Sequence, residues 1–223
     1  MCIRDRYSSY DDTKAIMFSI GCASIWLGLL NSVQEICKEK VILQKEHMAD
    51  LKLSSYLLSK FIVQGIIAFI QATLLVGIFQ KIVGSSEHSI LIDGYWDIQL
   101  VSFLSILAAA STGLFISAVV KNSNIAMSVI PLILVPQLLY SGMLFKLDGI
   151  TDFVSNFVLC RWTVEALGTS VNLNDLTHIA QTINPLIEIE PENYFTFTTE
   201  HMIEVIGIIL LMTAVLMLAS YFV

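Results

Sequence analysis

Paired charges that could form a specific contact gather in one stretch, residues 35–60, between two long apolar segments. The stretch contains Glu39–Lys40 and Lys45–Glu46 in a background that mixes apolar and charged residues. A helix of this composition usually lies with one face against a partner or a membrane surface, because its apolar side must be covered. We therefore expect a binding element here.

Motifs for catalysis, phosphate binding and metal binding are absent from the sequence. No G-x-x-x-x-G-K-[ST], G-x-S-x-G or H-E-x-x-H pattern occurs, and the four histidines and four cysteines have no metal or redox spacing. The net charge of −7 also disfavours nucleic-acid binding, which needs a basic surface. We predict no catalytic residue, no metal and no cofactor in this chain.

Hydropathy predicts an all-α, polytopic membrane protein with about five transmembrane helices. Hydrophobic residues make up 56% of the 223 residues and charged residues 14%, and a span needs about 20 mostly apolar residues. Five stretches without a charged residue fit: Ile16–Val33, Phe61–Phe79, Ile98–Val120, Asn122–Phe145 and Val205–Val223. Proton and ion relays usually need charged residues inside spans, so a proton-driven transporter is disfavoured. If the chain moves a substrate, its energy should come from a partner on the cytoplasmic side.

Lysines set the expected orientation, because cytoplasmic loops carry an excess of positive charge. Five lysines lie in residues 35–60, and Lys121 lies in a later link on the same side, so we place both links in the cytoplasm. Residue 16 then starts outside, and we expect at least one helix before it. We treat residues 1–15 as a truncated or non-native lead-in and 16–223 as the membrane domain. Reading the basic start of the chain as a signal peptide would reverse every side.

Two of the predicted spans carry features of close packing or of bending. In the third span small residues recur every four positions, at Ser105, Ala109, Gly113 and Ser117. Such a smooth face lets another helix approach closely. The fourth span contains Pro131 and Pro136, which bend a helix. The bend either lies beside a translocation path or is a structural kink with no part in transport.

After the fourth span the sequence predicts an outer helix that does not cross the membrane. Phe153–Leu167 is apolar but carries Arg161 and Glu165, and it is too short and too charged to span. We expect an outer re-entrant helix there, followed by an extracellular loop over residues 168–202.

Short motifs, in order and at matching intervals, give the chain a resemblance to a known family. They are Glu39–Lys40, Lys45–Glu46, Tyr56 and Ser59–Lys60 in the charged stretch, then Phe115–Ala118 with the turn after it, Leu139–Leu144 and Arg161–Leu167. Together they resemble the membrane domain of type-2 ABC exporters, particularly the G subfamily (the white and pleiotropic drug resistance group), over Met17–Ser170. The outer loop departs from the pattern, because it lacks the paired cysteines of some eukaryotic members.

This resemblance implies a fold, a function and partners. The chain would hold helices two to six of a six-helix permease domain, truncated at both ends, with a cytoplasmic coupling helix. It would be the permease part of an ATP-driven exporter of lipid-like, amphipathic or drug-like molecules in the cell membrane. A second permease copy, as a homodimer, and an ABC ATPase, fused upstream or on a separate chain, would complete it. ATP and Mg would bind to that ATPase and not to this chain.

The resemblance also implies roles for particular residues. Coupling contacts to the ATPase are expected from Glu35, Glu39, Lys40, Lys45, Glu46 and Tyr56. A substrate cavity is expected from Ser24, Leu27, Asn31, Leu134, Val135 and Leu138. An outer gate is expected from Leu139, Tyr140, Ser141, Gly142 and Met143. A solvated surface charge or ordinary helix packing is the alternative interpretation for each of them.

A function of another class stays open. The chain could be a non-transporting membrane scaffold or assembly protein that binds a cytoplasmic partner through residues 35–60. An ATP-binding cassette just upstream or in the neighbouring gene would support the exporter, and its absence from both would favour the scaffold.

Overall fold

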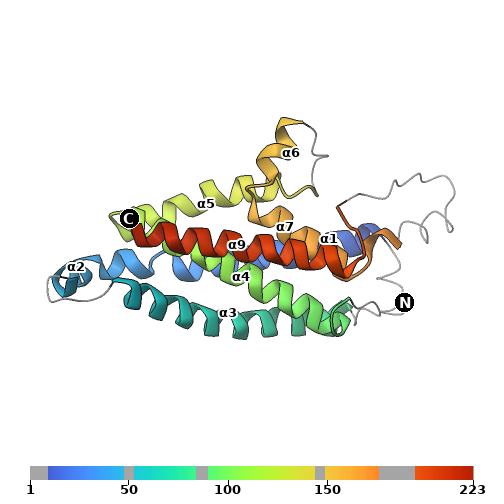
Figure 1. The fold of residues 1–223 in the computed structure, drawn as a ribbon, viewed down its shortest axis with the longest axis horizontal. Coiled ribbons are helices and arrows are strands. Elements are labelled where there is room, and N and C mark those ends of the chain that lie inside the picture. The colour runs from blue at the N-terminus through green and yellow to red at the C-terminus, as the bar shows by residue number, and fades with distance from the viewer. Residues whose placement is uncertain (1–9, 48–52, 84–89, 144–148, 176–193, 223) are drawn as a thin grey trace.

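The computed structural model describes residues 10–47, 53–83, 90–143, 149–175 and 194–222, and these parts are built from α-helices without a strand (Figure 1). In chain order the helices are α1 (Tyr10–Ser32), α2 (Glu35–His47), α3 (Leu53–Val83), α4 (Gly94–Val119), α5 (Ser123–Leu139), α6 (Ile150–Ser155), α7 (Leu159–Ser170) and α9 (Thr199–Phe222). The prediction of an all-α fold is confirmed.

Four helical segments are long and apolar enough to cross a membrane: α1 with the start of α2, then α3, α4 and α9. The chain is therefore a multi-pass membrane protein, as predicted. The fifth predicted span, Asn122–Phe145, forms the shorter helix α5 of 17 residues. Pro131 and Pro136 lie inside α5 without ending it. The helix ends at Leu139 because the backbone turns at Tyr140–Gly142.

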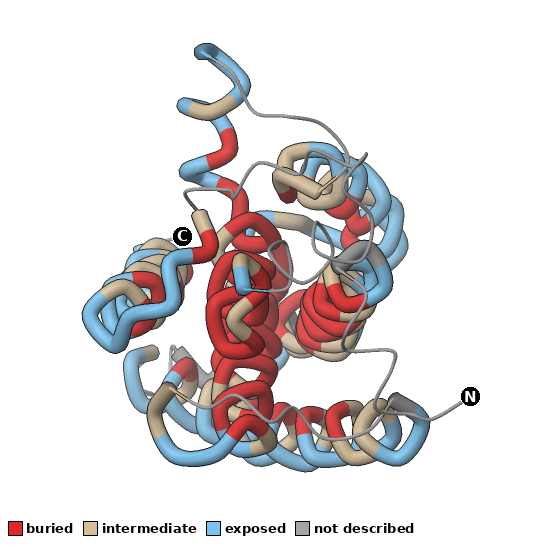
Figure 2. The backbone as a smooth tube through the Cα atoms, turned by 90° about the vertical axis from the view of Figure 1, so that its right-hand side faces the viewer, coloured by how far each residue is buried: buried red, intermediate tan, exposed pale blue. Residues whose placement is uncertain are grey.

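The central helix of the bundle is α4, which its neighbours cover on most sides (Figure 2). It contacts α1, α3, α7 and α9. The predicted smooth face is confirmed where α1 crosses it, because a Cβ added to Gly113 would collide with the Ser32 hydroxyl. On the facing helix, a Cβ added to Gly28 would lie 2.7 Å from the Cβ of Ala109. The two backbones therefore approach as closely as glycine allows.

The helices α3 and α9 present apolar side chains to the outside of the bundle. Those of α3 include Ile62, Ile66, Phe69, Leu74 and Ile78, and those of α9 include Ile203, Leu211, Val215 and Leu218. Outward apolar faces on helices of spanning length are the arrangement that a lipid environment requires.

The two ends of the bundle carry the helices that do not span. The charged helix α2 lies at one end, and α7 lies toward the other (Figure 1). The structure divides the predicted outer helix Phe153–Leu167 into α6 and α7, which are separated by Asn156–Val158. The short helix α6 stands away from the bundle (Figure 1), whereas α7 is buried against α1, α4 and α9.

Candidate functional site

One serine fastens the start of α2 to the central helix. The Ser117 hydroxyl oxygen accepts hydrogen bonds from the backbone N–H groups of Ile36 and Cys37, both at 2.9 Å. These donors lie in the first turn of α2, where a helix offers no carbonyl partner of its own. Such a cap usually comes from the residue before the helix. Here it comes from α4, and Ser117 is fully buried, so the start of α2 moves with α4.

A charge cluster joins α2 to the start of α3. Lys60 Nζ lies 3.1 Å from Glu35 Oε2 and 2.7 Å from Glu39 Oε1. The Tyr56 hydroxyl donates to Glu39 Oε2 at 2.7 Å, so both oxygens of Glu39 are engaged. The two carboxylate side chains remain 38% and 42% exposed, so each ion pair adds little stability. Together the contacts fix the angle between the two helices.

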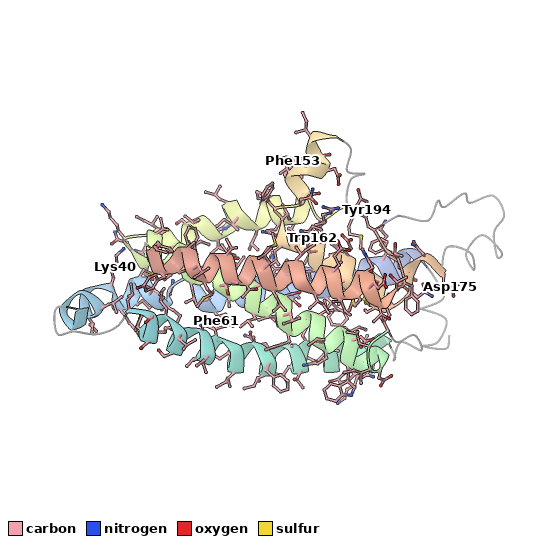
Figure 3. All side chains as sticks on the ribbon, viewed as in Figure 1. Lys40, Phe61, Phe153, Trp162, Asp175 and Tyr194 are labelled. Carbon is pink, nitrogen blue, oxygen red and sulfur yellow. The ribbon has the colours of Figure 1, made fainter. Side chains whose placement is uncertain are left out.

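Lys40 adds a second link from α2 to α4. Its ammonium group donates to the backbone carbonyl of Ala118 at 3.1 Å. Ala118 lies in the last turn of α4, where carbonyl groups lack helical partners and carry partial negative charge. Figure 3 shows Lys40 at the α2 end of the molecule.

The structure thus brings together four of the six predicted coupling residues: Glu35, Glu39, Lys40 and Tyr56. The backbone of Lys45 and Glu46 continues α2, but their side chains lie outside the described part of the chain. The side chains of Lys38 and Ile42 are exposed on α2. One face of α2 is therefore fastened to the bundle, and another is accessible.

The predicted cavity residues of α1 lie mostly inside the bundle. Ser24 is fully buried, and its hydroxyl donates to the Ile20 carbonyl at 2.8 Å. Leu27 packs against a cluster formed by α3 and α4. Asn31 is partly buried, and its Nδ2 has no hydrogen-bond partner among the described residues.

The predicted cavity residues of α5 divide between inside and outside. Leu134 belongs to the main core, whereas Val135 is 53% exposed and Leu138 is partly buried. Only Ala126, Ile130 and Leu134 of α5 are buried. The six predicted side chains therefore do not converge on one space within the described part of a single chain.

The predicted gate residues form the end of α5 and the turn that follows. Gly142 has a φ of 80°, in the left-handed region that favours glycine. The buried Ser141 closes the last turn, because its hydroxyl donates to the Leu138 carbonyl at 2.8 Å. Of the remaining gate residues, Leu139 is exposed, and Tyr140 and Met143 pack against the main core.

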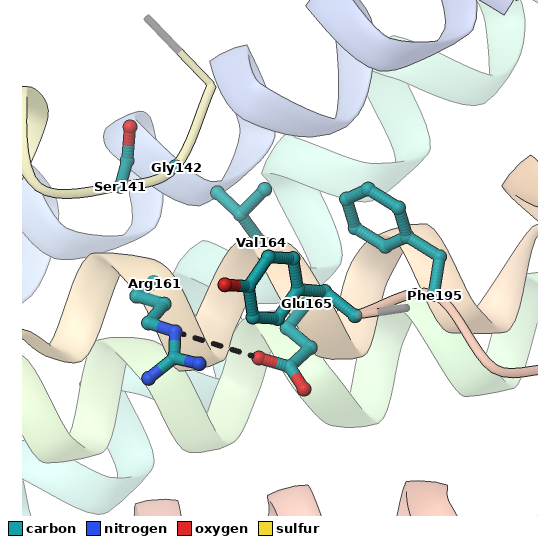
Figure 4. A pocket seen from close by; sticks show the side chains of 7 residues that line it. Ser141, Gly142, Arg161, Val164, Glu165 and Phe195 are labelled. Carbon is teal, nitrogen blue, oxygen red and sulfur yellow. Dashed lines mark ion pairs between the residues drawn. The ribbon is translucent and has the colours of Figure 1, made fainter. Parts of the chain in front are cut away.

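A buried group of charges lies beneath this turn. A small cavity of about 20 Å³ is lined by Ser141, Gly142, Arg161, Val164, Glu165, Tyr194 and Phe195 (Figure 4). Arg161 Nε lies 3.9 Å from Glu165 Oε2, and His201 Nε2 lies 3.3 Å from Glu165 Oε1. Arg161 Nη2 also lies 3.7 Å from Asp152 Oδ1. These contacts join α7 to α6 and to α9.

Two aromatic rings and one amide hold Arg161 in place. Its guanidinium lies 4.8 Å from the ring centre of Trp162 and 5.0 Å from that of Tyr194. It also donates to the side-chain oxygen of Asn156. Figure 3 shows Trp162 and Tyr194 in the half of the molecule away from Lys40. A cation over aromatic faces is stabilised when it is shielded from water, as Arg161 is.

Burial changes the acidity of this group. Loss of contact with water raises the pKa of the Glu165 carboxyl to about 7, although Arg161 and His201 favour its ionised form. Burial, followed by the hydrogen bond to Asp152, also raises the pKa of the Tyr194 hydroxyl. Glu165 therefore exists in both protonation states near neutral pH. No three His, Cys, Asp or Glu side chains in the described ranges are placed to hold a metal ion.

Sequence reasoning missed both the helix cap and the buried charge group. Ser117 fits the small-residue pattern, and that pattern predicts close packing without revealing the hydrogen bonds to α2. The available signal for the charge group is Arg161 and Glu165, one helical turn apart in an apolar segment. His201 comes from α9, and no local pattern connects it to Glu165.

Comparisons with known proteins identify the family of the chain. The family model described as ABC-2 type transporter matches residues 5–170. The chain is 22% identical over 162 residues to an ABC transporter ATP-binding/permease protein of Mycobacterium tuberculosis, across 71% of this chain and 19% of that protein. It thus spans about a fifth of the length of this curated relative. From the extent of the family match, the chain belongs to the ABC-2 type transporter membrane family.

Proposed function

We propose that this chain is the membrane-spanning permease part of an ATP-driven ABC exporter. It moves lipid-like, amphipathic or drug-like molecules out of the cytoplasm or the inner leaflet. The helix α2 is its coupling helix, and a separate or upstream nucleotide-binding domain, which holds ATP and Mg, drives α2 from the cytoplasmic side.

The attachment of α2 is the observation that carries this proposal. Lys60 ties α2 to α3, and Ser117 ties it to α4. A force on the exposed face of α2 is therefore passed to two long membrane helices at once. A helix that only bound a scaffold partner would not need to be fastened to two spans.

The energy source is supported by family membership, which implies an ABC ATPase partner. The relative from Mycobacterium tuberculosis is named as both ATP-binding and permease. Within this chain, the sequence holds no P-loop motif that could bind the phosphates of ATP. The absence of this motif supports a separate or upstream domain as the site of ATP hydrolysis.

The cargo class and the second permease copy are supported by the uncovered apolar surface of α5. Leu132 is 73% exposed and Val135 is 53% exposed, although both lie in an apolar helix. A second copy packed against this surface would cover part of it. The remaining apolar wall suits an amphipathic molecule better than an ion.

Photo-crosslinking from the exposed face of α2 tests the proposal. A photoreactive amino acid replaces Ile42, which is 58% exposed, and the matched control replaces Ile62 of α3, which is 54% exposed. In membranes that contain the complete transporter, we expect Ile42 to crosslink to an ABC ATPase domain and Ile62 not to. Mass spectrometry of the crosslinked peptides identifies that domain whether it is fused or separate.

Two other crosslinking results would contradict the proposal. An adduct of position 42 with a protein that is not an ABC ATPase, and none with an ATPase domain, would support the scaffold function and remove the coupling role of α2. Adducts of equal yield from both positions would show that the contact is not specific to α2.

A further inference from the structure

Glu165 is the meeting point of several elements at the end of the molecule opposite α2. It lies on α7, pairs with His201 of α9 and with Arg161, and Arg161 continues the link to Asp152 of α6. The turn at Ser141–Gly142 lines the same cavity (Figure 4). A change in the charge of this one carboxyl group therefore alters the electrostatic interactions of α6, α7, α9 and the end of α5.

The contacts of Glu165 do not satisfy an ionised carboxylate. Its side chain is 6% exposed, and neither its Oε2 atom nor Arg161 Nε has a hydrogen-bond partner in the described chain. The 3.9 Å between these two atoms is too long for a hydrogen bond. A buried charge that is paired loosely costs more than a neutral carboxyl group in the same place. The closed arrangement therefore favours a bound proton.

We infer that Glu165, held between Arg161 and His201 beneath the Ser141–Gly142 turn, is a proton-binding latch. While the proton is bound, the turn stays closed over α7. When the proton leaves, the ionised carboxylate draws water into the cavity, and the turn opens.

The direction of the pH effect follows from linkage. The closed state holds the proton with a pKa of about 7, against an ordinary value of 4.5 for a glutamate in water. Acid therefore stabilises the closed state. The open state, in which Glu165 is hydrated, becomes more favoured as the pH rises from about 4.5 to about 7, and the ratio levels off above that. This difference in proton affinity limits the change in the open-to-closed ratio to about 300-fold.

Five charged or titratable side chains lie close enough to Glu165 or Tyr194 to affect the pKa of these groups. They are Arg161 on α7 itself, Asp152 on α6, Tyr194 ahead of α9, and His201 and Glu204 on α9. His201 lies 3.3 Å from Glu165 and favours its ionised form, but less than burial disfavours it. The latch depends on this geometry alone, and only its effect on export rests on the proposed function.

A native tryptophan reports on the latch. Trp162 lies next to Arg161, and its indole N–H donates to the Asn156 carbonyl at 2.9 Å. Replacing Trp26 and Trp96 with phenylalanine leaves Trp162 as the single tryptophan of the chain. Acrylamide quenching of its fluorescence is then measured on the full chain in lipid nanodiscs from about pH 4 to about pH 9, a range that includes the pKa of Glu165 in both states.

We expect the quenching constant to rise at least twofold between about pH 4.5 and about pH 7 and then to level off, and to be independent of pH in Glu165→Gln. Glu204→Gln, the same change at an exposed glutamate of α9, should keep the rise. His201→Gln should keep it with a higher midpoint, because protonated His201 no longer stabilises the ionised carboxylate. A flat profile in the parent protein, or an unchanged rise in Glu165→Gln, would overturn the latch.

Infrared difference spectroscopy provides a second test, which does not depend on the folding of the glutamine variant. In the parent protein, the carbonyl stretch of a protonated carboxyl group should disappear with a midpoint between about pH 4.5 and about pH 7. Its absence would show that Glu165 holds no proton there. Neither measurement needs an ATPase or a transported substrate, so the latch can fail while the proposed function stands, and the reverse.

Discussion

At the scale of single residues, polar side chains satisfy the backbone donors of segments that lie across the ends of the spans. Ser117 does this for α2, and the side-chain oxygen of Gln137 accepts the Cys160 N–H of α7 at 2.9 Å. The Asp97 carboxylate accepts three N–H groups of residues 90–92 before α4. Unpaired backbone donors are costly where water is scarce. Each of these side chains therefore holds the backbone of a neighbouring segment in position.

Ser117→Ala should destabilise the protein by about 1–3 kcal/mol, because it leaves two buried N–H groups of α2 without a partner. Ser111→Ala is the matched control. Ser111 is also buried on α4, but its hydroxyl donates to the Leu107 carbonyl of its own helix, which already has a helical partner. Unfolding in mixed detergent and hydrogen exchange of the first turn of α2 measure the two effects. Equal losses in the two variants would contradict the capping role of Ser117.

The contacts at the α2 end could be predicted from the sequence better than those at the opposite end. Glu39, Lys40 and Tyr56 lie within one contiguous charged stretch of the sequence. In the structure these residues make contacts that join α2 to α3 and α4. Glu165 and His201 meet only because α7 and α9 pack together. A contact between distant segments leaves no spacing in the sequence, so that group could not be predicted.

At the scale of helices, α1 and α4 approach each other so closely that glycine is required at the contact. A Cβ at position 28 would collide with the Ile106 carbonyl oxygen and lie 2.9 Å from the Ala110 nitrogen. Both are backbone atoms, so no side chain can rotate away to make room. The position of α1 relative to the central helix is therefore set by the small residues of both.

Gly28→Ala should destabilise the bundle by about 1–3 kcal/mol, because added atoms in a closely packed contact push the backbones apart. Gly77→Ala on α3 is the control, since a Cβ there meets nothing within 4 Å. That variant should be neutral or stabilised by up to about 1 kcal/mol, because alanine favours the helix. Thermal unfolding in detergent distinguishes the two. A neutral Gly28→Ala would mean that α1 can shift along α4.

Hydropathy predicted the helices that are surrounded by lipid or by other helices, and it was less accurate where the backbone turns. The predicted spans lie within α1 with its following turn, α3 and α4. The division between α6 and α7 escaped it, because the break depends on Arg161 and Trp162 folding back onto Asn156. Those hydrogen bonds replace helical ones, and apolar periodicity does not reveal them.

At the scale of the whole molecule, the lysine distribution makes a prediction about orientation. The α2 end carries Lys38, Lys40 and Lys60, whereas the opposite end carries Asp152 and Glu165. Positive charge is retained in the cytoplasm, so we expect α2 to lie inside and α6 outside.

Cysteine labelling in intact cells tests this orientation in a cysteine-free background. A membrane-impermeant maleimide should label Phe157→Cys, at a position that is 70% exposed, before permeabilisation. It should label Ile42→Cys, at a position that is 58% exposed, only after permeabilisation. The reverse pattern would place α2 outside and would be incompatible with a cytoplasmic ATPase acting on it.

The unequal lengths of α5 and α3 have a consequence for the surrounding bilayer. The 17 residues of α5 reach about 25 Å and the 31 residues of α3 about 46 Å, against a hydrocarbon core of about 30 Å. A short helix such as α5 is accommodated by a thinner bilayer, by snorkelling of flanking residues or by a packed neighbour, and a long one such as α3 by tilting or by extending beyond the core. Lipid chain length is therefore a physical variable to which the two sides of the bundle should respond differently, and the shorter side is the one that carries the two prolines.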